Sequence, residues 1–127
     1  MAEHTRFDHV GPHFAVREVL HAKSFYEDVL GFGIEYIDGD PAQYAVVFRD
    51  EVYIHLSLSD DPVFHPGGGR AFVAVKGVDQ LWKQVCSVSE ESVCESLEDR
   101  DYGHGVRFRE FAVRDLDGNI LRIGEPM

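Results

Sequence analysis

The chain has 127 residues, of which 44% are hydrophobic and 28% charged, and these proportions are those of a folded domain with its own core. Its formal net charge of −11 argues against nucleic-acid binding, because phosphates would be repelled. No apolar run approaches the length of a membrane span, and residues 1–8 lack the basic and apolar stretches of a signal peptide. We therefore expect a cytoplasmic protein that binds neither nucleic acid nor membranes.

Two segments have the spacing of amphipathic helices. In the first, apolar residues recur at helical intervals from Val19 to Leu30, and Gly31 stands where a helix would end. The second has one apolar stripe, made of Val78, Leu81, Trp82, Val85 and Cys86. Both stripes predict helices that pack against a sheet.

Most of the remaining chain is predicted as strands. Residues 52–58 alternate strictly, so Tyr53, His55 and Ser57 share one face and the apolar residues between them share the other. The other predicted strands cover residues 71–75, 108–114 and 119–123, the last two joined by a turn signal at residues 115–119.

The order of strand, helix and three strands is repeated after a Pro/Gly-rich break. Residues 16–19 (VREV) precede the first helix much as residues 75–78 (VKGV) precede the second. We predict an α+β fold with two βαβββ modules in a single domain over residues 1–127. The expected bounds are 8–64 for the first module, 65–69 for the linker and 70–127 for the second module.

Two motifs resemble those of a known superfamily. Residues 16–32 (VREVLHAKSFYEDVLGF) resemble the opening signature of the vicinal oxygen chelate superfamily, which comprises glyoxalases, bleomycin-resistance proteins and dioxygenases. Residues 109–123 (REFAVRDLDGNILRI) resemble its closing hairpin, above all in bleomycin-resistance-like members. The resemblance implies a glyoxalase/bleomycin resistance fold, in which curved mixed sheets enclose a cleft, and usually a homodimer.

Metal-using members of that superfamily place one metal ligand on each of four strands. By the resemblance, these positions are occupied here by Gly11, His55, Arg70 and Arg122. Glycine has no side chain to donate and arginine stays protonated, so only His55 can bind a metal. We therefore expect a metal-free member without a cofactor. A shift of register on the first strand would bring in His9 or His13, and His13 with His55 is the remaining metal hypothesis.

The residues expected in the cleft combine aromatic rings, imidazoles and cations, which suits a flat organic ligand. Arg70 and Arg122 favour a carboxylate or phenolate, whereas the acidic surface favours a cationic glycopeptide of the bleomycin kind. Both arginines can instead pair with Glu110 or Glu125 and be structural. The predicted ligand-binding residues are His13, Tyr53, His55, Ser57, Arg70, Phe72 and Arg122.

Three functions follow from this cleft. The predicted one is a binding protein of the bleomycin-resistance type, which confers antibiotic resistance by sequestering a drug-like or aromatic metabolite ligand without turnover. The alternatives are a metal-dependent lyase, isomerase or dioxygenase, and a metal-free enzyme with His55 or His13 as general base and Arg122 or Arg70 steadying an anion. Ser57 has no base in its own motif, and nothing else in the sequence resembles a nucleophile–base arrangement. Because Arg122 lies on the polar face, we expect Arg122→Ala to leave folding nearly intact.

Overall fold

The elements of the structure, a computed structural model that describes residues 4–127, follow the predicted order. Residues 1–3, which begin the segment interpreted above as lacking a signal peptide, lie outside the described part. The first half contains β1 (His13–Val16), α1 (Val19–Leu30), β2 (Gly33–Asp38), β3 (Tyr44–Arg49) and β4 (Val52–Leu58). The second half contains β5 (Arg70–Ala74), α2 (Val78–Ser89), a short 3₁₀ turn (Glu90–Ser92), β6 (Val93–Gly103), β7 (Val106–Arg114) and β8 (Ile120–Pro126).

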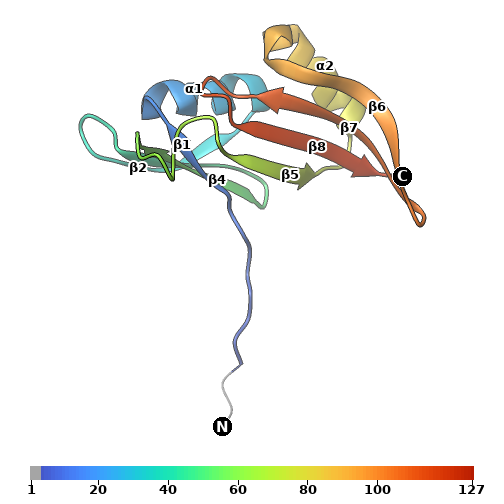
Figure 1. Cartoon of the computed structure of the whole chain (residues 1–127), viewed down its shortest axis with the longest axis horizontal. Coiled ribbons are helices and arrows are strands. Elements are labelled where there is room, and N and C mark those ends of the chain that lie inside the picture. Colours follow the sequence, from blue (N-terminus) through green and yellow to red (C-terminus); the bar gives the residue numbers. More distant parts are fainter. Residues whose placement is uncertain (1–3) are drawn as a thin grey trace.

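Each half forms its own four-stranded mixed sheet. The strand orders are β1-β4-β3-β2 and β5-β8-β7-β6, and the β1–β4 and β5–β8 pairs are parallel. Figure 1 shows the two sheets lying beside each other with both helices on the same side of them. This arrangement confirms the predicted α+β fold of two βαβββ modules. The two sheets do not close on each other, so the single chain does not form the enclosed cleft that we expected.

The helix-covered faces of the two sheets share one hydrophobic core. Ile54 and Leu56 of β4 are fully buried there, as the alternation of that strand predicts. In the second module, Leu121 of β8 belongs to the same core, and the ring of Trp82 on α2 lies 5.2 Å from the ring of Phe111. The opposite faces of both sheets are not covered by helices and are therefore available to bind a ligand or a partner.

The ends of α1 are fixed by its own sequence. The carboxylate of Glu18 accepts hydrogen bonds from the backbone N–H groups of Leu20 and His21, which have no partner inside the helix. Gly31 ends the helix in the left-handed conformation at φ 72°, a conformation that glycine adopts without steric cost. The predicted stop at Gly31 is confirmed.

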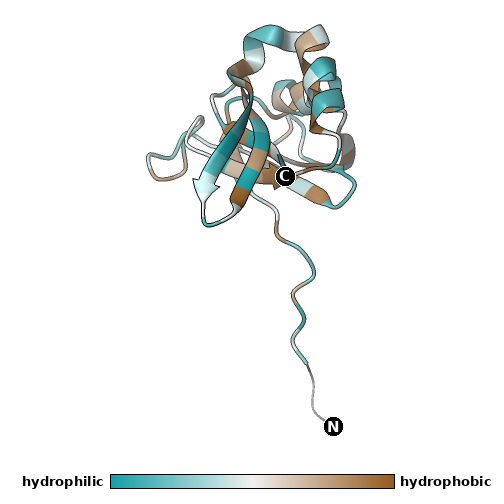
Figure 2. Ribbon diagram, turned by 90° about the vertical axis from the view of Figure 1, so that its right-hand side faces the viewer, coloured by the Kyte–Doolittle hydropathy of each residue, from teal (hydrophilic) through white to brown (hydrophobic). Residues whose placement is uncertain are grey.

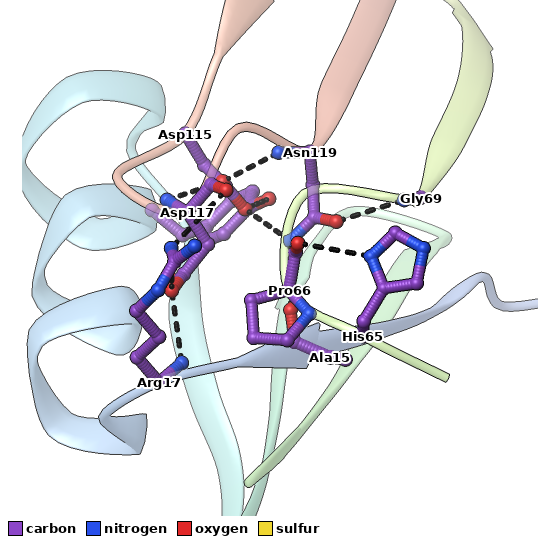
Figure 3. Close-up of polar contacts among 9 residues, drawn as sticks. Ala15, Arg17, His65, Pro66, Gly69, Asp115, Asp117 and Asn119 are labelled. Atoms are coloured by element: carbon purple, nitrogen blue, oxygen red, sulfur yellow. Dashed lines mark hydrogen bonds and ion pairs between the residues drawn. The ribbon is translucent and has the colours of Figure 1, made fainter. Parts of the chain in front are cut away.

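The turn between β7 and β8 joins the second module to the first (Figure 3). The buried Asn119 donates from Nδ2 to the carbonyl oxygen of Ala15 at 3.0 Å and accepts from the N–H of Gly69 at 2.9 Å. Asp117 accepts from the backbone N–H of Arg17 at 2.8 Å and pairs with its guanidinium at 3.2 Å. These contacts hold β1, the start of β5 and the β7–β8 turn in fixed positions.

The N-terminal part of the segment before β1 leaves the body of the molecule, although the ring of His9 still lies beside Tyr53. Figures 1 and 2 show this part extending away from both sheets. Its apolar side chains meet little of the chain, since Phe7 is 94% and Val10 87% exposed. Within residues 4–127, no helix is long and apolar enough to cross a membrane.

Candidate functional site

The first sheet presents a continuous surface of rings on the side away from the helices. The register of β1 on β4 sets His13 opposite His55, and that of β3 on β4 sets Val46 opposite His55, so these side chains share one face. The rings stand over Val46, which is buried beneath them. We call this surface the aromatic face; its members are His9, His13, Tyr36, Tyr44, Phe48, Tyr53, His55 and Phe64.

The rings of the aromatic face are close enough to hold one another in place. Tyr53 stacks on Phe48 with ring centroids 5.7 Å apart, and the His9 ring lies 5.1 Å from Tyr53 on its other flank. Phe64, from the loop after β4, lies 5.0 Å from the ring of His13. This loop therefore reaches the aromatic face, a point that the sequence left open.

His55 is fixed by a neighbouring tyrosine. The hydroxyl of Tyr44 and Nδ1 of His55 are hydrogen-bonded at 2.5 Å. Burial lowers the pKa of His55 below its ordinary value, and the nearby imidazoles of His13 and His9 lower it further. His55 is therefore neutral at neutral pH, and one of its ring nitrogens donates while the other accepts.

Ser57 has a partner that the sequence did not reveal. Nε2 of His13 lies 2.5 Å from Oγ of Ser57, across the parallel pairing of β1 with β4. No motif in the sequence indicated this proximity of a hydroxyl to an imidazole. The contact arises because Ser57 is two residues beyond His55 on the same strand face, and β1 runs alongside. No carboxylate within residues 4–127 hydrogen-bonds to His13, so the pair lacks the group that orients the base in a catalytic triad.

The second sheet carries a network of charges on its outer face. Nη1 of Arg122 lies 2.8 Å from Oε2 of Glu110, and Nη2 contacts the carboxylate of Glu95. Glu110 is only 1% exposed and also accepts a hydrogen bond from the hydroxyl of Tyr102. The hydrogen bond to Glu95, with that to Glu110, raises the pKa of Arg122 above its ordinary value. The charge of Arg122 is thus balanced by two carboxylates. This is the structural role that the sequence left open as an alternative to anion binding.

Arg70 and Phe72 lie on the same sheet but differ in their surroundings. Phe72 pairs with Arg122 in the β5–β8 register, is 47% exposed, and has its ring 5.2 Å from Phe108. Arg70 pairs with Ile120 and is exposed, with no ion pair to any residue within 4–127. Phe72 and Phe108 therefore form an apolar pair on this face, and Arg70 is a cation open to solvent.

The strand register decides whether a metal fits. Gly11, assigned by the resemblance, lies where an added Cβ would come within 3.1 Å of the His55 ring, and His13 pairs directly with His55. On the second sheet, Arg70 pairs with Ile120, and Phe72 lies opposite Arg122. Of these residues, only His13 and His55 can donate to a metal, because glycine and phenylalanine have no donor group and the arginines stay protonated. Two donors are fewer than the three that a metal centre needs. Within residues 4–127, no three histidine, cysteine or acidic side chains come together in a geometry that fits a metal ion. The side chains present do not fit such a centre, and a metal-free mode of action stays a prediction.

The structure gathers the predicted ligand-binding residues into two groups. His13, Tyr53, His55 and Ser57 lie together on the first sheet. Arg70, Phe72 and Arg122 lie together on the second. Within residues 4–127, no hydrogen bond, ion pair or ring contact joins one group to the other.

Some important residues of both groups were not predicted. Tyr44 lies opposite Ser57 in the register, but β3 (YAVVFR) has no alternation in its sequence that would have marked the face of Tyr44. Glu95 was not predicted, because β6 pairs with β7 through register shifts that no pattern in its sequence marks. Tyr102, which also lies on β6, was not predicted for the same reason.

Comparison with known proteins bears on this geometry. A family model described as glyoxalase superfamily protein matches residues 2–126. The chain belongs to the glyoxalase superfamily. The family resemblance drawn from residues 16–32 and 109–123 is thereby confirmed. No curated protein sequence matches the chain significantly.

Solved structures share this superfamily fold at low identity. TioX from Micromonospora sp. ML1 superimposes with a TM-score of 0.78 at 19% identity, covering 95% of this chain and 100% of its own. The bleomycin-binding protein from Streptomyces verticillus, solved with copper(II)-bleomycin, gives 0.73 at 23%, covering 94% and 97%. Lactoylglutathione lyase from Agrobacterium tumefaciens gives 0.66 at 18%, covering 89% of each chain. Both a binding protein and an enzyme therefore share the architecture.

Proposed function

We propose that this superfamily member binds a flat aromatic or drug-like molecule on the aromatic face and sequesters it without metal or turnover. The observation that carries the proposal is the aromatic face itself, a set of mutually braced rings with neutral His55 among them. Stacking on rings supplies affinity, and hydroxyl and imidazole groups orient the ligand. The bleomycin-binding protein among the structural relatives supports this mode of action and leaves the identity of the ligand open.

The charges support a neutral or cationic ligand. Arg70 and Arg122 together were the argument for a carboxylate. The charge of Arg122 is balanced by Glu95 and Glu110, and Arg70 lies on the second sheet and not on the aromatic face. The chain as a whole carries a formal net charge of −11, which attracts cations and repels anions over the distance of a Debye length. A planar cation therefore suits the surface better than a planar anion.

A second copy of the chain would enclose the ligand. The aromatic face is open in the single chain, and Phe7 and Val10 are exposed on the segment that leads away from it. A homodimer in the cytoplasm, as predicted from the sequence, is thus part of the proposal. Sedimentation equilibrium tests it, since a dimer has twice the 14.4 kDa of one chain.

Isothermal titration calorimetry with three ligands tests the binding function. Metal-free bleomycin, 9-aminoacridine as a planar cation and 2-naphthoate as a planar anion are titrated into the full chain. We expect the cations to bind more tightly, and Tyr53→Leu or His55→Gln to weaken binding about tenfold. Leu116→Ala is the control. Leu116 is exposed on the β7–β8 turn, so this change should leave affinity unchanged. Equal binding by the face variants and the parent chain would overturn the proposal.

A metal-free enzyme is the second candidate, and the contact between His13 and Ser57 favours it. A lyase or isomerase with His55 as general base uses the same surface. Mass spectrometry of the ligand after prolonged incubation separates the two functions, because a binding protein returns the molecule unchanged. A product formed in excess over the protein, and lost in His13→Gln or His55→Gln, would favour the enzyme.

A further inference from the structure

A cavity of about 490 Å³ lies between the two modules, on the side of the sheets that carries the helices. It is bounded by the end of α1, the β3–β4 turn, the end of β5 and the first half of α2. Val52 of β4 lines it, whereas the next residue, Tyr53, belongs to the aromatic face, so the cavity and that face lie on opposite sides of the sheet. Its apolar floor consists of Leu30, Phe32, Val52, Val73, Leu81 and Leu121.

The repeat of the two modules explains why this space is unfilled. At the equivalent junction on the other side of the repeat, the β7–β8 turn is fastened to the first module. There Asp115 accepts from the hydroxyl of Tyr26 at 2.8 Å, Asn119 donates to Ala15, and Asp117 pairs with Arg17. These bonds draw the turn against β1 and α1 and close that junction.

The β3–β4 turn lacks the residues that would fasten it in the same way. Matching the registers of the two hairpins makes Arg49 the counterpart of Asp115 and Val52 the counterpart of Asn119. Val52 has no polar group, and Arg49 instead donates to the carbonyl oxygen of Leu30 at 2.9 Å. Lys76, the counterpart of Arg17, forms no ion pair within residues 4–127. The turn stays away from α2, and the cavity remains between them.

The walls of the cavity are held without a ligand. Arg49 and Gln84 both donate to the last carbonyl groups of α1, Arg49 to Leu30 and Gln84 from Nε2 to Val29 at 3.3 Å. These carbonyls lack partners inside the helix, so the two side chains satisfy them and stay in place. A preformed cavity of this volume is in the range that binds small organic molecules.

We propose that this cavity is a second ligand site, which takes a small amphipathic anion with one acidic group on an apolar or aromatic body. The apolar body would cover the floor, and the acidic group would lie at the rim against the ammonium of Lys76. Asp50 and Glu51 stand on the same rim and oppose any negative charge there, so the ligand carries a single acidic group, which must lie at Lys76. The site is independent of the aromatic face and prefers the opposite sign of ligand charge.

Titration of the full chain with 8-anilinonaphthalene-1-sulfonate tests the site, because this probe combines an aromatic body with one sulfonate and fluoresces in apolar surroundings. We expect one saturable site on the parent chain. Leu81→Trp fills the cavity and should weaken binding more than tenfold. Lys76→Gln removes the cation and should weaken it about two- to fivefold, as exposed charge pairs do.

Two control variants test whether the loss of probe binding is specific to the cavity. Lys83→Gln removes the same charge from an exposed position of α2 outside the cavity and should leave affinity unchanged. Tyr53→Leu on the aromatic face should also leave it unchanged. Circular dichroism on each variant establishes that it is folded. Absence of a saturable site on the parent chain, or loss of probe binding in Tyr53→Leu but not in Leu81→Trp, would overturn the inference while leaving the proposed function of the aromatic face untouched.

Discussion

The hydroxyl of Tyr26 donates a hydrogen bond of 2.8 Å to Oδ2 of Asp115, a residue 89 positions further along the chain. Both side chains are buried, and Asp115 also accepts from Nδ2 of Asn119 at 3.1 Å. Burial raises the pKa of Tyr26 well above its ordinary value, and the adjacent carboxylate adds to the shift. A helix of the first module is thereby tied to a turn of the second at a point shielded from water.

We predict that Tyr26→Phe lowers the free energy of unfolding by about 1–2 kcal/mol, because a buried carboxylate oxygen loses its donor while the ring is kept. Urea denaturation of the full chain measures the change. Tyr36→Phe is the control, since Tyr36 is exposed on the aromatic face and should change stability by less than about 0.5 kcal/mol. An equal effect of the two changes would show that the contact between the modules adds no stability.

The charge network of the second sheet yields a second prediction. Arg122→Met leaves the buried Glu110 with the hydroxyl of Tyr102 as its one remaining side-chain partner within residues 4–127. Removing one member of a buried pair should lower the free energy of unfolding by about 3 kcal/mol. This revises our expectation that Arg122 is dispensable for folding, since the sequence did not reveal that Glu110 is buried.

A double-mutant cycle distinguishes this effect from lost packing. Glu110→Gln combined with Arg122→Met should be less destabilised than the sum of the two single changes, because no buried charge is left alone. Arg109→Met, which removes a half-buried arginine whose partners Asp79 and Asp99 are exposed, should have a much smaller effect. Additive losses in the cycle would contradict the role given to Arg122.

The comparison of sequence with structure is clearest on single strands. The alternation of β4 predicted which of its side chains face the helices, and Gly31 predicted the end of α1. Periodicity within a strand does not fix its register on a neighbour: Gly11 and His13 both approach His55, and Phe72 rather than Arg70 pairs with Arg122. Glu110 was named from the sequence as a possible partner of Arg122. Glu95, the other partner, required the pairing of β6 with β7, whose register shifts leave no sequence signal.

Two leucines near the β7–β8 turn provide a test of the core. Leu121 is 2% exposed and Leu116 is 64% exposed, although only five positions separate them. Leu121→Ala should lower the free energy of unfolding by about 2–5 kcal/mol, because it opens a cavity beneath the helices. Leu116→Ala should change it by less than about 0.5 kcal/mol. Similar melting curves for the two variants would contradict the packing of β8 against the helices.

Metal content gives a prediction that bears directly on function. We expect no stoichiometric zinc, nickel, manganese or iron in untagged protein purified without chelators, because the residues opposite each other on the four strands include only two imidazole donors. Elemental analysis by mass spectrometry measures it. Near-stoichiometric metal that is lost in both His13→Ala and His55→Ala would reverse the proposal and favour the enzymatic alternative.

The last prediction concerns the pH dependence of the aromatic face. The pKa of His55 is lowered in the folded chain, chiefly by burial and then by His13 and His9. The unfolded chain therefore binds a proton at this residue more readily, and its stabilising contribution is present above the ordinary histidine pKa of about 6.5 and is lost as the pH falls below it. The free energy of unfolding should decrease between about pH 7 and pH 5, and His55→Gln should decrease less over that range. His104→Gln, which changes an exposed histidine in the β6–β7 turn, should keep the full pH dependence of the parent chain. Urea denaturation at each pH measures the difference, and a steeper fall in His55→Gln than in the parent would reverse the assigned sign.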